Sequence, residues 1–146
     1  MKNISLFKII AVIIIITTII FIIVANIIEK TNIENKLYED QKQYFEKYIS
    51  EKSNSKTTID LLNNLEKYID SKYENPEVIP AVEFYGTDND NCMMLYSATD
   101  ELQKTNYKKE LENAKSKIKE KDTYFIICEY DDNNEYINKI VIEKNY

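Results

Sequence analysis

The stretch that decides the fold is Ile9-Ile-Ala-Val-Ile-Ile-Ile-Ile-Thr-Thr-Ile-Ile-Phe-Ile-Ile-Val-Ala-Asn-Ile-Ile28, 20 residues without a charge, of which twelve are isoleucine. At a rise of about 1.5 Å per residue, a helix of this length spans about 30 Å, the thickness of the hydrocarbon core of a bilayer. The run therefore predicts a single transmembrane helix. The remaining chain is then a domain attached to a membrane anchor.

A cleaved signal peptide is the alternative to a retained helix. Signal peptides have an apolar region of about 7 to 15 residues that ends in a small-x-small cleavage site. Here the run is longer, and Ala25 near its end has no small partner two positions away. The first cysteine is Cys92, so lipid attachment at a new N-terminus is excluded. We therefore expect the helix to be retained.

The orientation of the helix follows from the lysines beside it. Lys2 and Lys8 precede the run without any acidic residue. The lysines beyond the run are more widely spaced and mixed with acids: Lys30, Lys36 and Lys42 with Glu29, Glu34, Glu39 and Asp40. A higher density of basic residues marks the cytoplasmic side. We expect a cytoplasmic N-terminus and an extracytoplasmic domain at the cell membrane.

Residues 29–146 are strongly acidic. They hold all 25 acidic residues and 17 of the 19 lysines, a net charge of −8. Such a domain is repelled by phosphate backbones and by anionic lipid head groups. Nucleic acid is therefore disfavoured as a partner. The 118 residues suffice for one modest domain with a stalk, and not for two separate cores.

The residue types that are missing restrict the chemistry. Without histidine, the chain has no imidazole base, no Ser-His or Cys-His pair and no ordinary catalytic zinc site. The single glycine, Gly86, cannot form a phosphate-binding glycine loop. Two carboxylates can suffice for glycoside hydrolysis, but no pair stands out by its spacing. We expect a protein that is not an enzyme and that carries no cofactor.

The chain is predicted to divide into five segments. Beyond the membrane, apolar residues at helical spacing indicate an amphipathic stalk, whose exposed stripe is a candidate interaction surface: Ile33, Leu37, Tyr44 and Tyr48. The segments are an N-terminal tail (1–8), the transmembrane helix (9–28), the stalk (29–50), a polar linker (51–56) and a small α+β domain (57–146).

The small domain is predicted to contain two helices and two hairpins. A capping-box spacing at Thr57 starts a helix that ends before Pro76, and Ser97 starts the second helix. Short apolar runs separated by turn residues predict hairpins of 81–85 with 92–96 and of 123–130 with 136–143. The expected fold is α+β, with helices packed on an antiparallel sheet of these two hairpins.

Two oxygen-rich turns could be read as metal sites or as plain turns. Asp131, Asn133 and Glu135 match the start of a calcium loop, but position six is Tyr136 rather than glycine, and position twelve is Ile142 rather than glutamate. Asp and Asn are also the residues that tight turns favour. We favour a hairpin turn here and, for the same reason, at residues 88–90. No metal site is predicted.

Cys92 and Cys128 fall in different predicted strands of one domain. Outside the cell they could form a disulfide, which would close a loop of about 35 residues and contribute about 3 to 4 kcal/mol. They could equally be two buried thiols that act as small apolar side chains. The sequence leaves both possibilities open.

The layout resembles that of pilin-like proteins, the type IV pilins and pseudopilins. The resemblance lies in an apolar N-terminal helix from Met1 to Ile28 that runs into a stalk, followed by a small sheet ending in a hairpin such as Tyr130-Asp-Asp-Asn-Asn-Glu-Tyr-Ile137. The segment from Lys2 to Lys8 lacks the glycine and the glutamate of the prepilin cleavage motif. The resemblance implies an architecture and a role in assembly, without peptidase processing.

Together these patterns predict a single-pass membrane protein with an acidic extracytoplasmic domain. The expected role is that of a non-enzymatic, pilin-like assembly or interaction protein. Its partners would be membrane lipid, through residues 9–28, and a second protein or another copy of the chain. The alternative is a membrane-anchored accessory protein that binds or senses a small ligand.

Overall fold

The protein is described from a computed structural model of its 146 residues. The structure describes the backbone of residues 2–72, 74–86, 91–94 and 101–146, and the side chains of 6–72, 74–86 and 101–146. Two compact units are formed, Met1–Lys36 and Leu37–Tyr146. The second unit combines helices with a sheet, which confirms the α+β class.

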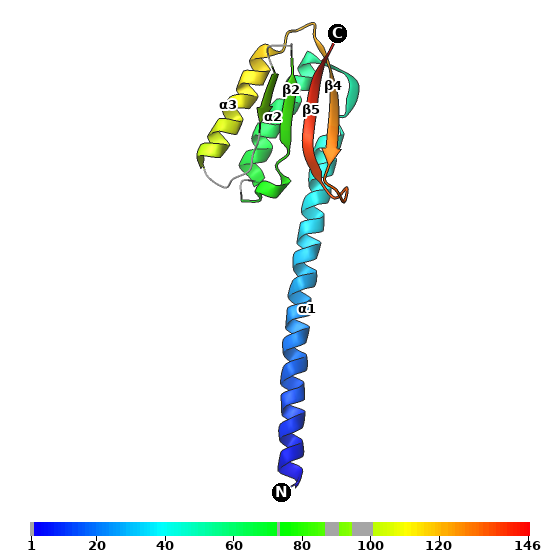
Figure 1. The fold of residues 1–146 in the computed structure, drawn as a ribbon, viewed down its shortest axis with the longest axis vertical. Helices are drawn as coiled ribbons and strands as arrows, with labels where there is room; N and C mark the ends of the chain where they lie inside the picture. Colours follow the sequence, from blue (N-terminus) through cyan, green and yellow to red (C-terminus); the bar gives the residue numbers. More distant parts are fainter. Residues whose placement is uncertain (1, 73, 87–90, 95–100) are drawn as a thin grey trace. The chain divides into compact units, whose positions relative to one another are not determined.

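The first unit belongs to one long helix, α1 (Lys2–Glu46) (Figure 1). Its most apolar 18-residue window has a mean hydropathy of 3.1, and none of that window is buried. Among the described residues it is the one helix that is long and apolar enough to cross a membrane. It is therefore a candidate transmembrane or signal anchor.

The second unit begins within the last turns of α1, at Leu37, rather than at residue 57 as the sequence predicted. The reason is that the end of α1 is packed into the core of this unit. The elements that follow α1 are β1 (Ser50–Asn54), α2 (Ser55–Lys72), the short 3-10 helix η1 (Pro76–Val78), β2 (Ala81–Tyr85), β3 (Asn91–Met94), α3 (Glu101–Lys117), β4 (Thr123–Tyr130) and β5 (Ile137–Asn145).

The sheet has five strands in the order β1-β4-β5-β2-β3. Both predicted hairpins are present, since β2 pairs with β3 and β4 with β5, in each case antiparallel. They join through a parallel pair, with Val82 of β2 opposite Ile140 of β5. The sheet is therefore mixed, and the prediction of a purely antiparallel sheet was wrong. A parallel join is possible here because α3 lies in the long connection between β2 and β5.

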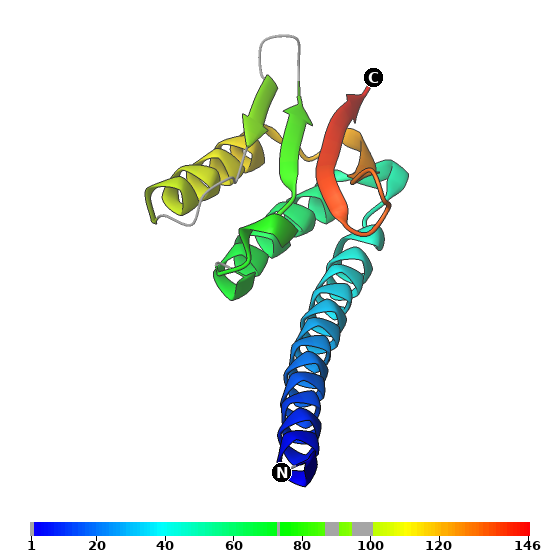
Figure 2. The same cartoon turned by 60° about the horizontal axis from the view of Figure 1, so that its bottom comes forward.

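One face of the sheet carries the core. Along β4, Tyr124, Ile126 and Cys128 are buried, whereas the residues between them are half-buried or exposed, as expected for a strand with one covered face. The buried residues of α1, α2 and α3 join the same cluster. Figure 2 shows α2 and α3 on the same side of the sheet. The unit is thus a two-layer structure of helices on a sheet.

The predicted polar linker, residues 51–56, is instead the edge strand β1 and the start of α2. Ser50 and Ser53 pair with β4 through an irregular register, and Ser53 is buried. The side chain of Asn54 accepts a 2.8 Å hydrogen bond from the N–H of Thr57 and so caps α2. The helix therefore begins before the Thr57 cap that the sequence predicted. The polar strand was missed because it lacks apolar alternation.

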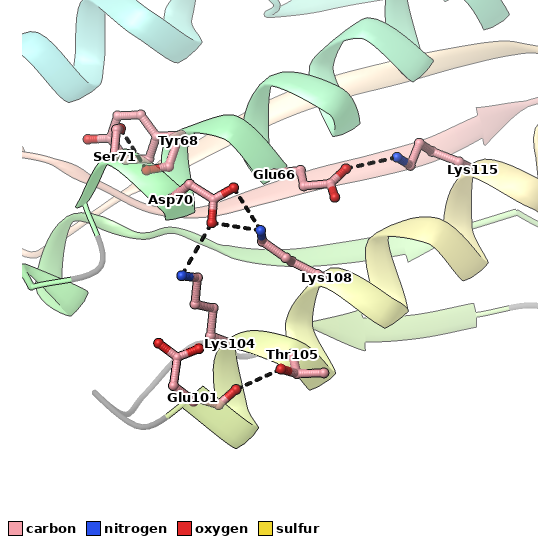
Figure 3. A network of polar contacts seen from close by, with 9 residues as sticks. All are labelled: Glu66, Tyr68, Asp70, Ser71, Glu101, Lys104, Thr105, Lys108 and Lys115. Atoms are coloured by element: carbon pink, nitrogen blue, oxygen red, sulfur yellow. Dashed lines mark hydrogen bonds and ion pairs between the residues drawn. The ribbon is translucent and has the colours of Figure 1, made fainter.

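Helices α2 and α3 are joined by ion pairs as well as by apolar packing (Figure 3). Asp70 of α2 accepts from Lys108 at 2.7 Å and lies 3.3 Å from Lys104, while Glu66 lies 3.3 Å from Lys115. The hydrogen bond from Lys108 holds the pKa of Asp70 below its usual value. Asp70 remains half-exposed, so these pairs add about 1 kcal/mol or less each and mainly set the register of the two helices.

Candidate functional site

Three of the four residues in the predicted stalk stripe lie within the second unit, Leu37–Tyr146. Tyr48 is buried in the core, and Leu37 and Tyr44 are partly buried against it. Ile33 alone belongs to the first unit, where it is 62% exposed. The prediction that the stripe is a free interaction surface is therefore wrong for Leu37, Tyr44 and Tyr48. The helical spacing did indicate a buried face, but the partner of that face is the domain's own core.

A polar residue in the middle of this buried face, Gln41, was not predicted to matter. Its amide nitrogen donates to the carbonyl oxygens of Val78 at 2.8 Å and Ile137 at 2.9 Å, and its Oε1 accepts from the N–H of Ile137 at 2.6 Å. Gln41 is fully buried. It ties the end of α1 to η1 and to the start of β5. The signal for it was a glutamine at helical spacing between Leu37 and Phe45.

The loop at Asp131 is the predicted hairpin turn. The Asp131 carboxylate accepts hydrogen bonds from the backbone N–H groups of Asn133, Glu135 and Tyr136, at 3.1, 2.6 and 3.0 Å. Asn134 adopts the left-handed conformation, with a φ of 58°, which asparagine tolerates well. The backbone bonds, above all that from Tyr136, lower the pKa of Asp131. The carboxylate is thus used to close the turn.

No metal-binding cluster of three or more acidic, cysteine or histidine side chains occurs among the residues whose placement is described. The other oxygen-rich turn that the sequence singled out, at residues 88–90, lies outside the described residues.

Cys92 and Cys128 are not placed for a disulfide. Cys128 is a free, buried thiol on β4, and Cys92 lies on β3, opposite Phe84 of β2. Two strands separate β3 from β4, so the backbones are about 14 Å apart at about 4.8 Å per strand spacing. A disulfide needs Cα atoms about 4.4 to 6.8 Å apart. The disulfide interpretation is therefore wrong, because the two hairpins join through β2 and β5 and not through the cysteine strands.

Burial suppresses the reactivity of the titratable groups in the core. Burial, with a smaller contribution from the charge of Glu46, raises the pKa of the Cys128 thiol to about 12. Burial also raises the pKa of Tyr107, whose hydroxyl donates to the carbonyl of Pro80 at 2.7 Å. Groups that stay protonated at neutral pH are poor nucleophiles and poor bases. These core side chains therefore act in packing and hydrogen bonding.

A groove runs along one face of α1 within the first unit. It has a volume of about 560 Å³ and is lined by residues at successive helical spacings: Phe21, Val24, Ala25, Ile28, Glu29, Asn32, Ile33 and Lys36. The hollow arises where the short side chain of Ala25 lies between the bulky Phe21 and Ile28. Sequence reasoning missed this face, although an alanine among isoleucines, Ala25, was its signal. A small residue of this kind lets a second helix approach closely in a membrane.

The domain carries another hollow, of about 490 Å³, whose lining mixes polar and apolar surface. It is lined by Lys56, Thr57, Ile59, Asp60 and Asn63, all of which belong to the first turns of α2. Side chains from one helix surface do not converge on a bound molecule as those of a ligand pocket do. The groove on α1 is also formed by a single helix, but its apolar lining suits a second helix in a membrane rather than a small ligand, so it is the stronger candidate site.

No protein-family model matches the chain, and neither a curated protein nor a solved structure matches it. Its function is therefore argued from the two units themselves.

Proposed function

We propose that the chain is a single-pass membrane protein that acts as a non-enzymatic, pilin-like assembly or interaction protein. The observation that carries this proposal is the exposure of the apolar run in the first unit. Its bulky apolar side chains from Leu6 to Ile28 are each between 46% and 75% exposed. At about 25 cal/mol per Å² of apolar surface, a surface of this extent is strongly unfavourable in water and favourable in lipid.

The proposed orientation places the N-terminus in the cytoplasm and residues 29–146 outside the cell. Lys2 and Lys8 support it, because basic residues beside a span are retained on the cytoplasmic side. Protease added to intact cells should then digest the domain and leave a small membrane-bound fragment. Protection of the full-length chain would reverse the orientation, and a soluble mature form would mean that the helix is cleaved.

Packing of α1 against a second transmembrane helix is supported by a line of short residues. Ala11, Thr18, Ala25 and Asn32 recur at intervals of seven in a helix that is otherwise rich in isoleucine. Seven residues are nearly two helical turns, so these positions lie along one face. The hydroxyl of Thr18 donates to the carbonyl of Ile14 at 2.8 Å, so it is satisfied within its own helix. The face formed by these short side chains therefore allows close helix packing rather than a polar contact.

Cysteine cross-linking in membranes tests whether this face pairs two copies of the chain. With Cys92 and Cys128 replaced by serine, a cysteine at Ala25 should form a disulfide-linked dimer under mild oxidation. A cysteine at Ile23, on the opposite face of the same turn, is the matched control and should remain mostly monomeric. Equal cross-linking at both positions, or at neither, would count against assembly through this face.

A further inference from the structure

The sheet has a second face that no buried helical residue joins. Within the part of the chain that the structure describes, every buried apolar side chain of the strands belongs to the core cluster on the helical side. The opposite face, called the open face below, presents only half-buried and exposed side chains among the described residues. It comprises Phe125, Ile127 and Glu129 of β4, Lys139, Val141 and Glu143 of β5, and Ala81, Glu83 and Tyr85 of β2.

The centre of the open face is apolar. Ile127 lies directly opposite Val141 across the β4–β5 pair, and Phe125 lies two positions before Ile127 on β4, on the same face. Ile127 is 49% exposed although it stands on an inner strand of the sheet. An exposed isoleucine beside a half-buried valine and a half-buried phenylalanine forms an apolar patch in the middle of the sheet, and contiguous apolar patches mark surfaces that bind another protein.

Acidic groups surround this apolar centre. Lys139 lies between two carboxylates, 3.1 Å from Glu83 and 2.9 Å from Glu129, so its charge is already compensated. The hydroxyl of Tyr85 donates to Glu83 at 3.0 Å and adds no positive charge. Glu143 is exposed and forms no ion pair within the described part of the chain. These nine residues of β2, β4 and β5 carry three carboxylates against one ammonium, a net charge of −2.

We propose that the open face docks a different protein through an apolar side chain flanked by lysine or arginine. The charge of the face argues for this occupant, because complementary charges steer association and reject the wrong partner. A second copy of this chain would bring the same net negative face against it. Anionic lipid head groups would be repelled in the same way. This docking rests on the proposed function in one respect, because the partner must lie on the same side of the membrane as residues 29–146.

Photo-cross-linking in the cells that carry the protein tests this proposal. The full-length chain receives p-benzoyl-phenylalanine in place of Ile127 on the open face. The control carries it in place of Asn113, which is exposed on α3. Ile127 should give one discrete adduct with a different protein, whose cross-linked surface carries lysine or arginine. The position on α3 should not give that adduct.

Charge variants then test whether the negative charge of the open face attracts the partner. Glu143→Gln should lower the yield of the adduct, and Glu143→Lys should lower it further, to about one third or less, as expected for a charge at the rim of an interface. Glu112→Lys on α3 is the control and should leave the yield unchanged, since Lys115 keeps Glu66 as a partner. An adduct with a second copy of the chain, an adduct with lipid, no adduct, or an adduct insensitive to Glu143→Lys would each overturn the proposal. Cross-linking through Ala25 is independent of these results, so failure of helix assembly can be distinguished from failure of docking.

Discussion

Gln41 and Ile137 are joined by two hydrogen bonds, since the side-chain amide of Gln41 donates to the carbonyl of Ile137 at 2.9 Å and accepts from its N–H at 2.6 Å. The Gln41 amide thus makes the two hydrogen bonds to Ile137 that the backbone of a neighbouring strand would otherwise make where β5 begins. Next to it, the β4–β5 register is irregular between Glu129 and Tyr130. A residue of the helix therefore supplies the hydrogen bonds that fix the start of the last strand.

Replacement of Gln41 should be among the most damaging single changes in the domain. Gln41→Leu keeps the apolar packing but leaves the carbonyls of Val78 and Ile137 and the N–H of Ile137 without this partner. We expect a loss of about 3 kcal/mol in the free energy of unfolding, since each buried group that loses its partner costs about 1 to 3 kcal/mol. Urea unfolding of the full-length chain in detergent, followed by circular dichroism, measures the loss.

Gln43→Leu is the matched control for this change. Gln43 lies on the same helix but is exposed, so its replacement should change the free energy of unfolding by about 0.5 kcal/mol or less. Equal effects of the two substitutions would show that the buried hydrogen bonds of Gln41 add little to stability.

Two buried tyrosines should respond in opposite ways to loss of the hydroxyl. The hydroxyl of Tyr107 donates to the carbonyl of Pro80, whereas the buried hydroxyl of Tyr68 has no hydrogen-bond partner among the described residues. Tyr107→Phe should lower the free energy of unfolding by about 1 to 2 kcal/mol. Tyr68→Phe should leave it unchanged or raise it, because it removes a polar group that is buried without a partner. Thermal unfolding of the two variants compares the two substitutions directly, and similar destabilisation by both would contradict the prediction.

The turn at Asp131 should make stability depend on pH in the acid range. Backbone N–H groups, that of Tyr136 foremost, lower the pKa of Asp131 in the folded state. A carboxyl group with a lowered folded pKa stabilises the fold fully above its unfolded pKa of about 3.9, and this contribution is lost as the pH falls through the folded pKa. Asp131→Asn should therefore flatten the fall in stability below about pH 4.

Urea unfolding between pH 2 and pH 6 measures this dependence. Asp132→Asn is the control, because Asp132 is exposed and its side chain makes no hydrogen bond within the described residues. A pH profile that is the same for Asp131→Asn and for the unmodified chain would refute the role assigned to the turn.

Cys128 should behave as a slow, buried thiol. Burial raises its pKa to about 12, so the reactive thiolate is scarce at neutral pH. In a Cys92→Ser variant, a maleimide should label Cys128 slowly in the folded protein and completely after denaturation without a reductant. A cysteine placed at the exposed Asn113 is the control and should react rapidly in the folded state. Rapid labelling of Cys128 in the folded protein would contradict its burial.

The sequence alone determined those features that depend on local pattern. An uncharged run from Ile9 to Ile28 specifies a long apolar helix whatever follows it, because nearly all of its side chains are apolar and prefer lipid to water. The alternation along Thr123–Tyr130 specified a strand with one covered face, and the acidic turn after it specified the β4–β5 hairpin. These signals lie within a few residues of the structure that they predict.

Only the tertiary structure decided which faces meet. Helical spacing at Leu37, Tyr44 and Tyr48 predicts that one face is buried, but the same spacing suits another molecule or the chain's own core. The parallel pairing of β2 with β5 and the polar edge strand Ser50–Asn54 depend on backbone hydrogen bonds between distant segments, which side-chain pattern does not record. Gln41 belongs to the same class, because its partners Val78 and Ile137 lie 37 and 96 residues away, and only the folded chain brings them within hydrogen-bond distance.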